Sequence, residues 1–200
     1  MNRMVLTGII IVCSLGILAV FAPVFSSYDY REQNISDRLQ PPSSQHLMGT
    51  DEFGRDVFTR MLYGARISMS VGLMAVLISS FIGILLGSIS GYLGGWVDNV
   101  IMRFVDIVLT IPTLFLILIL VVFLGPSIFN IMFIIGLTSW TDIARIMRAE
   151  VMKLKKSGFV DAARLTGLNK MSIIIKHILP NAISPIFVYM TFGISGAILT

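Results

Sequence analysis

The sequence predicts an all-α membrane protein, a bundle of helices that crosses the bilayer several times. Of its 200 residues, 56% are hydrophobic and 13% are charged, and the mean hydropathy is +0.88. A soluble domain carries about 25% charged residues, so this chain has too little polar surface to face water all round. Several uncharged runs are long enough to cross a bilayer as helices. We expect five such spans within the chain.

The first element is expected at residues 1–25, as an uncleaved N-terminal transmembrane helix. Its uncharged run, from Met4 to Tyr28, is longer than the apolar part of a usual secretory signal, and no clean A-x-A cleavage site precedes Pro23. Pro23 should end or kink the helix near its outer edge, because proline lacks the amide hydrogen.

Residues 26–66 are expected to form an extracytoplasmic loop with short helices. A pair of prolines and the polar residues after it are typical of loop structure. Thr50 or Asp51 can cap a short helix, which continues as an amphipathic segment over residues 56–61. Across residues 26–65, four arginines stand against six carboxylates, so the net charge is −2.

The rest of the chain, residues 67–200, is predicted to form the transmembrane core. Three glycines spaced four apart share one face of the second span, which lets another helix approach closely. A proline inside the third span predicts a kink. The core spans are expected at about 67–96, 97–124, 128–146 and 181–200; the glycines are Gly83, Gly87 and Gly91, and the proline is Pro112.

Few charged residues fall within these spans. Asp106 and Asp142 are expected close to cytoplasmic ends, paired with Arg103 and Arg145. No acidic residue is expected near the middle of a span, where ion-coupled carriers generally place ionisable or broken-helix sites.

The charge of the second polar segment, residues 142–178, predicts the orientation. Eight basic residues stand against three acidic ones, a net charge of +5. Basic loops stay on the cytoplasmic side, so this segment and the N-terminus are both expected there. The same rule explains the overall charge of +4 without a nucleic-acid partner. The last span is still apolar at Thr200, which leads us to expect a sixth span beyond it.

Several motifs for catalysis or metal binding are absent from the sequence. It has no G-x-x-x-x-G-K-[ST] loop for ATP and no H-E-x-x-H zinc motif. The segment from Asp51 to Asp56 resembles a calcium loop only superficially, because the twelfth position is Leu62 rather than glutamate. His46 and His177, the only histidines, are predicted on opposite sides of the membrane. We therefore expect no catalytic residue, metal or cofactor on this chain.

The stretch from Ser157 to Asn181 is polar although it separates two apolar spans. It predicts a helix of about two turns, with Ser157 as its N-cap and Gly167 as the left-handed residue that ends it. Such a short helix is not stable alone, so it must dock on a cytoplasmic partner, on the membrane or on its own bundle. One face carries Phe159, Ala162, Ala163 and Thr166, and the other carries Asp161 and Arg164.

The pattern D-A-A-x-x-x-G, followed after nine residues by H-I-L-P, resembles the EAA signature of permeases in binding-protein-dependent ABC importers. Asp161 stands where the general pattern has glutamate, and His177 where it has isoleucine, as is usual in the peptide and nickel branch. The segments HLMGTDEFGRD, LYGARIS and GYLGGWVD are similar to the C-type permease of dipeptide, oligopeptide and nickel importers. The resemblance extends from Leu47 to Thr200.

This resemblance implies a subunit that forms half of a translocation pathway for peptides or nickel. It implies a second, different permease subunit, two cytoplasmic ATPase subunits that hold ATP and Mg, an extracytoplasmic substrate-binding protein, membrane lipid, and a multi-pass location in a bacterial or archaeal inner membrane. The helix within a coupling loop, residues 147–180, would insert into a groove of an ATPase. The expected coupling residues are Phe159, Asp161, Ala162, Ala163, Arg164, Gly167, His177, Leu179 and Pro180, and the extracytoplasmic motif is Gly49, Thr50, Asp51, Gly54, Arg55 and Asp56.

Two functions of other classes remain open from the sequence. The first is a secondary transporter that works alone. The second is an intramembrane serine protease, suggested by G-x-S-G at 193–196, although no histidine follows it. The basic residues from Arg145 to Lys156 either contact an ATPase or only set the topology. The cargo is not readable, and a lone loop histidine such as His46 is usually polar surface rather than a nickel ligand.

Overall fold

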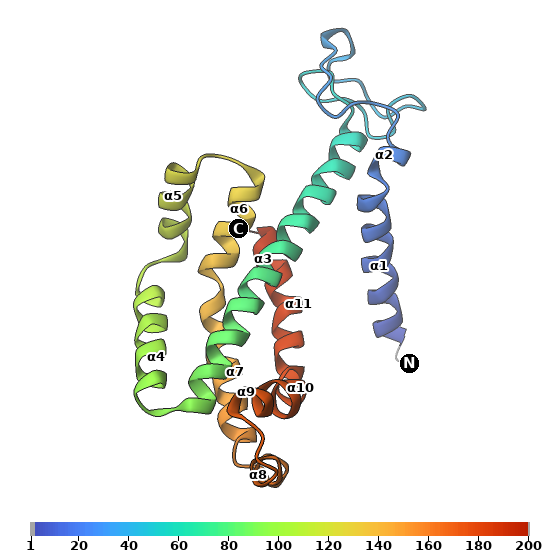
Figure 1. Cartoon of the computed structure of the whole chain (residues 1–200). Helices are drawn as coiled ribbons and strands as arrows, with labels where there is room; N and C mark the ends of the chain where they lie inside the picture. Colours follow the sequence, from blue (N-terminus) through green and yellow to red (C-terminus); the bar gives the residue numbers. More distant parts are fainter. Residues whose placement is uncertain (1–2, 200) are drawn as a thin grey trace. The chain divides into compact units, whose positions relative to one another are not determined.

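In the computed structural model, which describes residues 3–199, the regular elements are helices (Figure 1). No strand occurs in that range, and the one bridge of β type joins Thr50 to Asp56. The all-α prediction is therefore confirmed for the described residues. Contacts divide the chain into two units, with a boundary between Ser70 and Val71 that falls within one long helix.

The first unit contains α1 (Arg3–Val20), α2 (Ala22–Phe25), a loop with the short 3₁₀ helix η1 (Ile35–Asp37), and the start of α3 (Val57–Leu93). Pro23 lies in the first turn of α2, so the predicted break after the first apolar helix is confirmed. The separate short helix predicted before residue 61 is wrong. These residues form the first turns of α3, because Asp56 accepts a hydrogen bond from the amide of Thr59 (2.7 Å) and caps that helix.

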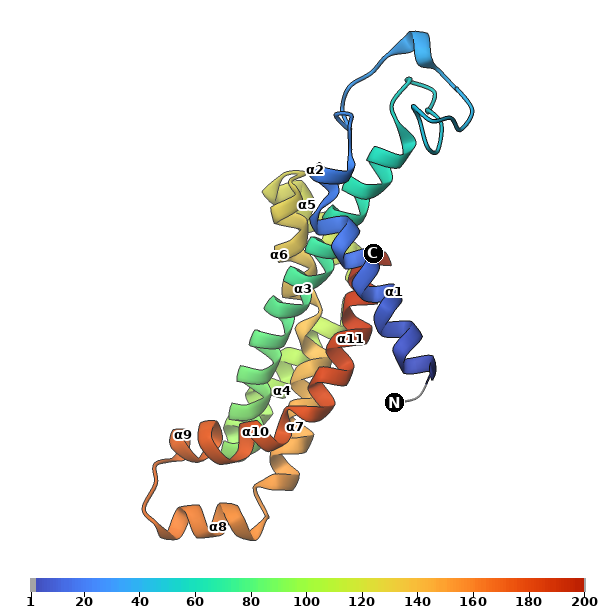
Figure 2. The same ribbon diagram turned by 90° about the vertical axis from the view of Figure 1, so that its right-hand side faces the viewer.

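The second unit contains the rest of α3 and a series of shorter helices. Figure 2 shows α8, α9 and α10 together at one end of this unit. The helices after α3 are α4 (Gly95–Thr110), α5 (Thr113–Leu124), α6 (Ile128–Thr138), α7 (Trp140–Leu154), α8 (Gly158–Leu165), α9 (Lys170–Ile173), the π-helix η2 (Ile174–Ile178), α10 (Leu179–Ala182) and α11 (Ser184–Leu199).

Close contact between α3 and α7 depends on the glycine stripe that the sequence predicts. A Cβ added at Gly83 would lie 2.7 Å from Ile143, one at Gly87 would lie 2.5 Å from the carbonyl oxygen of Ala144, and one at Gly91 would lie 2.7 Å from that of Arg148. Residue numbers increase along both helices from one contact to the next, so α3 and α7 run parallel. The packing role of the stripe is confirmed.

Three breaks interrupt the apolar helices of the second unit. Residues 111–112 separate α4 from α5, which are bent by 87° to one another, so Pro112 produces a full break rather than the predicted kink. Ser139 separates α6 from α7, in the middle of the predicted fourth span. A bend of 62° separates the α9–α10 segment from α11.

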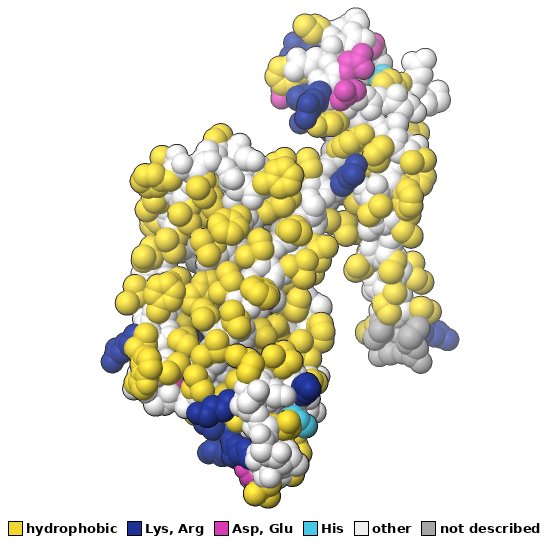
Figure 3. Space-filling model, viewed as in Figure 1, with side chains coloured by type: hydrophobic (Ala, Val, Ile, Leu, Met, Phe, Trp, Pro, Cys, Tyr) yellow, Lys and Arg dark blue, Asp and Glu magenta, His cyan; other side chains and the backbone are white. Residues whose placement is uncertain are grey.

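These breaks affect the number of spans. By length and composition, α3 is the one described helix that could cross a membrane by itself, and each of two bent pairs could form a further, broken span. The shorter apolar helix Leu6–Val20 adds a fourth apolar segment. The five predicted spans are therefore not confirmed by helix length. Apolar side chains nevertheless cover the visible face of the second unit, and basic side chains gather at the end that carries α8 (Figure 3).

Candidate functional site

The helix α8 is fixed to its own bundle by a narrow inner face. Val160 has no exposed surface and Ala163 is 6% exposed, and both belong to one apolar cluster with Tyr92 of α3, Met147 of α7 and Ile178 of η2. The prediction that Ala163 shares one face with Phe159, Ala162 and Thr166 is thus wrong, since Ala163 faces the bundle and the other three are exposed. The docking of α8 on its own chain explains how so short a helix is stable.

The outer face of α8 is apolar and exposed. Leu165 is 90% exposed and Phe159 is 43% exposed, and Ala162 and Thr166 are exposed between them. Two large apolar side chains on a helix that already has a buried face are costly to leave in water. We define these four residues, Phe159, Ala162, Leu165 and Thr166, as the outer face of α8.

The two ends of α8 form in different ways. Ser157 occupies the predicted N-cap position, but its hydroxyl donates to the carbonyl of Leu154 (2.5 Å) instead of accepting from the helix, so the predicted side-chain cap is wrong. Gly167 has φ +77°, and its amide donates to the carbonyl of Arg164 (3.0 Å). The predicted left-handed stop at Gly167 is confirmed.

Charged side chains border α8 on the side of the α3–α4 turn. Arg164 donates to Asp161 (2.8 Å), and the guanidinium of Arg164 and the ammonium of Lys155 lie 5.9 Å and 5.5 Å from the ring of Tyr92. A cavity of about 440 Å³ opens beside them, and Asp98 forms part of its lining. Asp98 binds Arg148 through two hydrogen bonds of 2.5 and 2.6 Å and also accepts one from Ser90. Arg148 is therefore held inside this chain rather than displayed to a partner.

The second half of the predicted coupling loop is a distorted helix. Pro180 has no amide hydrogen, and the turn before it widens into the π-helix η2, in which the amide of Leu179 donates to the carbonyl of Ile174. The side chain of Asn181 donates to the carbonyl of His177 (2.7 Å). Pro180 is exposed, whereas His177 and Leu179 are half-buried. These three residues thus belong to the distorted helical segment against which α8 packs.

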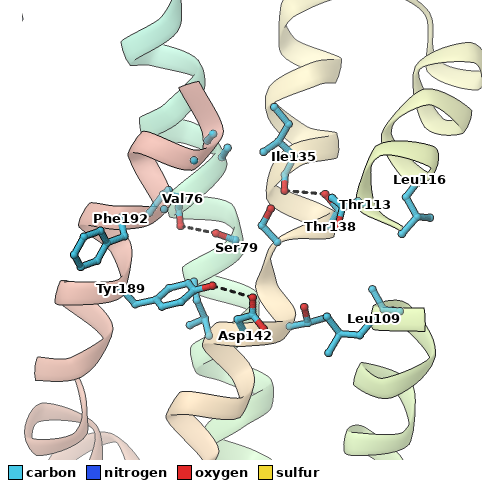
Figure 4. Close-up of a pocket in the computed structure, with 18 of the residues that line it drawn as sticks. Val76, Ser79, Leu109, Thr113, Leu116, Ile135, Thr138, Asp142, Tyr189 and Phe192 are labelled. Carbon is cyan, nitrogen blue, oxygen red and sulfur yellow. Dashed lines mark hydrogen bonds between the residues drawn. The ribbon is translucent and has the colours of Figure 1, made fainter. Parts of the chain in front are cut away.

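A cavity of about 430 Å³ lies within the second unit, lined by α3, the α4–α5 break, the α6–α7 break and α11 (Figure 4). Asp142 is among its lining residues, and the hydroxyl of Tyr189 donates to this carboxylate (2.9 Å). Arg145 binds Asp106 instead (2.7 Å). The predicted pairs Asp106–Arg103 and Asp142–Arg145 are therefore wrong. Asp142, which was expected close to a cytoplasmic end of the fourth span, lies in the first turn of α7 and lines this cavity.

The motif predicted for the extracytoplasmic loop lies in residues 26–56, which we call the first loop. Its side chains bind residues of the same part of the chain. The Asp51 side chain accepts from the backbone amides of Phe53 and Arg55, and it binds the guanidinium groups of Arg55 and Arg60. Desolvation would raise the pKa of Asp51, but the hydrogen bonds from Arg55 and Phe53 and the charge of Arg55 outweigh it and lower the pKa to about 2. Gly49 and Gly54 have positive φ, and Thr50 accepts from the amide of Gln40 (2.8 Å).

Asp56 and His46 form the buried part of this first loop. His46 is 7% exposed, stacks on Tyr28 with ring centroids 4.9 Å apart, and places Nδ1 3.0 Å from Asp56. Burial acts to raise the pKa of Asp56, but the hydrogen bonds from Thr59 and His46 prevail and lower it. The expectation that His46 is polar surface is wrong, because the ring is a core residue of the loop.

Comparisons with known proteins identify the family of the chain. Residues 83–200 match the family described as "Binding-protein-dependent transport system inner membrane component". The chain belongs to this family. Residues 1–42 match the "N-terminal TM domain of oligopeptide transport permease C". The resemblance found in the sequence is therefore confirmed.

Named relatives of this family cover almost the whole chain. The dipeptide transport system permease protein DppC of Alkalihalophilus pseudofirmus is 43% identical over 99% of the chain and 65% of the relative. The oligopeptide transport system permease protein OppC of Bacillus subtilis is 40% identical over 100% of the chain and 65% of the relative. The chain spans 65% of the length of these two relatives.

Sequence reasoning missed three features of these sites. Leu165 follows Ala162 by three residues, so helical spacing could have assigned it to the same outer face. Tyr92 lies in the GYLGGWVD segment, but its contacts with Lys155 and Arg164 depend on the tertiary fold. The position of Asp142 in a cavity depends on the break at Ser139, which no proline or glycine signals.

Proposed function

We propose that this chain is the permease subunit of an ATP-driven ABC importer for peptides, and that the outer face of α8 docks on a cytoplasmic ATPase subunit. The observation that carries the proposal is the exposed apolar outer face of a helix whose inner face is anchored in the bundle. Membership of the family and the names of its relatives support the transport role. ATP and Mg would be held by the partner subunits, so this chain is a transport subunit rather than an enzyme.

Movement of α8 has a direct route into the bundle. Val160 and Ala163 share an apolar cluster with Met147 and Val151 of α7. The same helix α7 lies against the glycine stripe of α3 and supplies Asp142 to the cavity. Closure of two ATPases would push α8, shift α7 along α3, and alter the cavity, which is the type of two-state movement that alternating access requires.

The orientation and partners follow from this proposal. The basic end that carries α8 would face the cytoplasm, as would the N-terminus, and the first loop would lie outside. A second, different permease subunit would complete the pathway, and an extracytoplasmic binding protein would deliver the cargo. We retain the sequence-based count of five spans, some of them broken, in a bacterial or archaeal inner membrane.

Peptides are a better supported cargo than nickel. The relatives described above are named for dipeptides and oligopeptides. His46, the tempting nickel ligand, stacks on Tyr28 and is bound to Asp56. The rival protease motif also has a packing role, since a Cβ at Gly193 would lie 3.2 Å from Val76. A stand-alone transporter would need no docking face on α8.

The test is the substitution Leu165→Asp in the complete transporter, purified with its partner subunits. An aspartate buried in an apolar groove removes apolar contact and adds a desolvated charge, so we expect at least about a tenfold loss of co-purifying ATPase. The measurement is the ratio of ATPase to permease subunits after size-exclusion chromatography. The second permease subunit should stay bound.

Leu47→Asp is the matched control, since Leu47 is also an exposed leucine but lies in the first loop. It should retain the ATPase. Equal retention of ATPase by both variants would refute docking through α8. ATP-independent uptake by the reconstituted chain alone would instead support the secondary transporter.

A further inference from the structure

The cavity next to Asp142 has one charged group and otherwise apolar or hydroxyl-bearing walls. Its volume is about 430 Å³, and Asp142 is the one charged side chain among the described residues that line it. Val76 and Ser79, near the middle of α3, also line it (Figure 4). Asp142 is an exposed residue, so its carboxylate lies on the wall of an open cavity between apolar helices, where a charge without an ion-pair partner is unfavourable.

No basic side chain in the described part of the chain forms an ion pair with Asp142. The nearest candidate along α7, Arg145, binds Asp106 at 2.7 Å. The described hydrogen bond to Asp142 comes from the neutral hydroxyl of Tyr189 (2.9 Å), which positions the carboxylate but does not balance its charge. A cation from outside the chain would supply the missing charge.

The hydroxyl groups of the cavity favour a ligand that donates hydrogen bonds. Ser79 donates its hydroxyl hydrogen to the carbonyl of Val76 (3.1 Å), and Thr138 donates to the carbonyls of Ile134 and Ile135 (3.0 and 3.1 Å). Their hydrogens are thus used within their own helices, and the oxygen lone pairs remain as acceptors. A carboxylate with nearby acceptors matches an ammonium group, which has three donors and no acceptor.

From these observations we propose that the cavity is a binding station for the protonated amino group of a passing peptide, with Asp142 as its counter-ion. This inference rests on the proposed transport function. The apolar walls formed by Leu109, Leu116, Ile135 and Phe192 suit the side chain next to that amino group. Tyr189 holds the carboxylate toward the cavity while the ligand is absent.

The test compares three variants of the complete transporter in proteoliposomes, supplied with binding protein, ATP and a labelled peptide that has a free amino terminus. Asp142→Asn removes the charge, and we expect peptide uptake to fall about tenfold or more. Asp142→Glu keeps the charge and should retain most uptake. Tyr189→Phe removes only the internal hydrogen bond, so uptake should also be largely retained.

Two outcomes would overturn the inference. One is wild-type uptake by Asp142→Asn. The other is a fall in Tyr189→Phe as deep as that in Asp142→Asn, which would make the pair a structural link between α7 and α11. If Asp142→Asn does not assemble, Thr138→Val takes its place, with an expected fall of about threefold and unchanged uptake as the contrary result. Failure of the proposed function itself would be distinct, because the wild-type transporter would then show no ATP-dependent peptide uptake.

Discussion

The first loop and the second loop (residues 155–169, which include α8) each carry a motif of charged and small residues, but they direct it in opposite ways. In the first loop, Asp51 and Asp56 turn inward and bind groups of the same loop and of the first turn of α3. In the second loop, Asp161 is exposed and its partner Arg164 is a neighbour on the same short helix. A recognisable motif can therefore serve folding in one loop and remain available to a partner in another.

The glycines of the two loops show the same contrast. Gly54 has φ +70°, and an added Cβ would lie 1.7 Å from the carbonyl oxygen of Asn34. Gly167 has φ +77°, but nothing lies within 4 Å of the position that its Cβ would occupy. The first loop is packed around its glycine, whereas the second loop needs glycine only for its backbone angle.

The largest expected effect comes from alanine at these two glycines. Gly54→Ala combines a steric clash with backbone strain, so we expect about 3 kcal/mol or more of local destabilisation. Gly167→Ala carries the backbone strain alone, about 1 kcal/mol. Hydrogen exchange of the amides in each loop measures both. Equal costs at the two positions would remove the contrast between a packed loop and an open one.

A smaller difference is expected between two aspartates. Asp56→Ala removes the cap of α3 and leaves His46 buried without its partner, which should cost about 2 kcal/mol in the first loop. Asp161→Ala breaks an exposed pair and should cost less than about 1 kcal/mol in stability. If Asp161 contacts an ATPase, peptide uptake should show the opposite order, with a larger loss in Asp161→Ala than in Asp56→Ala. Hydrogen-exchange rates of the two variants measure the stability costs, and their peptide uptake measures the effect on transport. A stability cost at Asp161 as large as that at Asp56 would contradict the comparison.

The smallest expected effect is the loss of stability of the first loop at low pH. The pKa of Asp51 is about 2 in the folded loop, below its ordinary value of 3.8. A carboxylate with a lowered pKa stabilises the fold above the ordinary value, and this contribution is lost as the pH falls from about 4 toward 2. The protection of the amides of residues 51–56 against hydrogen exchange, relative to the intrinsic exchange rate at each pH, should therefore fall over that interval. Asp51→Asn should already be destabilised at neutral pH and respond less to acid, while an unchanged wild-type loop at pH 2 would argue against the role of Asp51.

The sequence was most informative where the local chain decides the structure. The break at Pro23, the left-handed Gly167 and the close approach at Gly83, Gly87 and Gly91 each depend on one residue type with a definite steric property. The family resemblance was also readable, because several motifs occur in order. The helical class was predicted instead from the long uncharged runs, and the short helix from the polar stretch between two apolar spans.

The partners of individual side chains could not be predicted in the same way. Arg145 binds Asp106 rather than Asp142, and these residues lie on different helices whose register depends on the whole bundle. Ala163 shares a helix with Ala162, yet one is buried and the other exposed, because the rotation of α8 follows the apolar cluster beneath it. The helix break at Ser139 has no proline or glycine to announce it, so the cavity beside Asp142 was not foreseen.

Photo-crosslinking from the outer face of α8 tests the docking proposal most directly. In the complete transporter with Cys13→Ser, a benzophenone maleimide is attached at Leu165→Cys, and in a second sample at Leu47→Cys. We predict that the probe at position 165 crosslinks to an ATPase subunit and that the probe at position 47 does not. A probe at position 165 that reacts only with lipid or with the other permease subunit, while the ATPase remains bound, would contradict the docking role of α8.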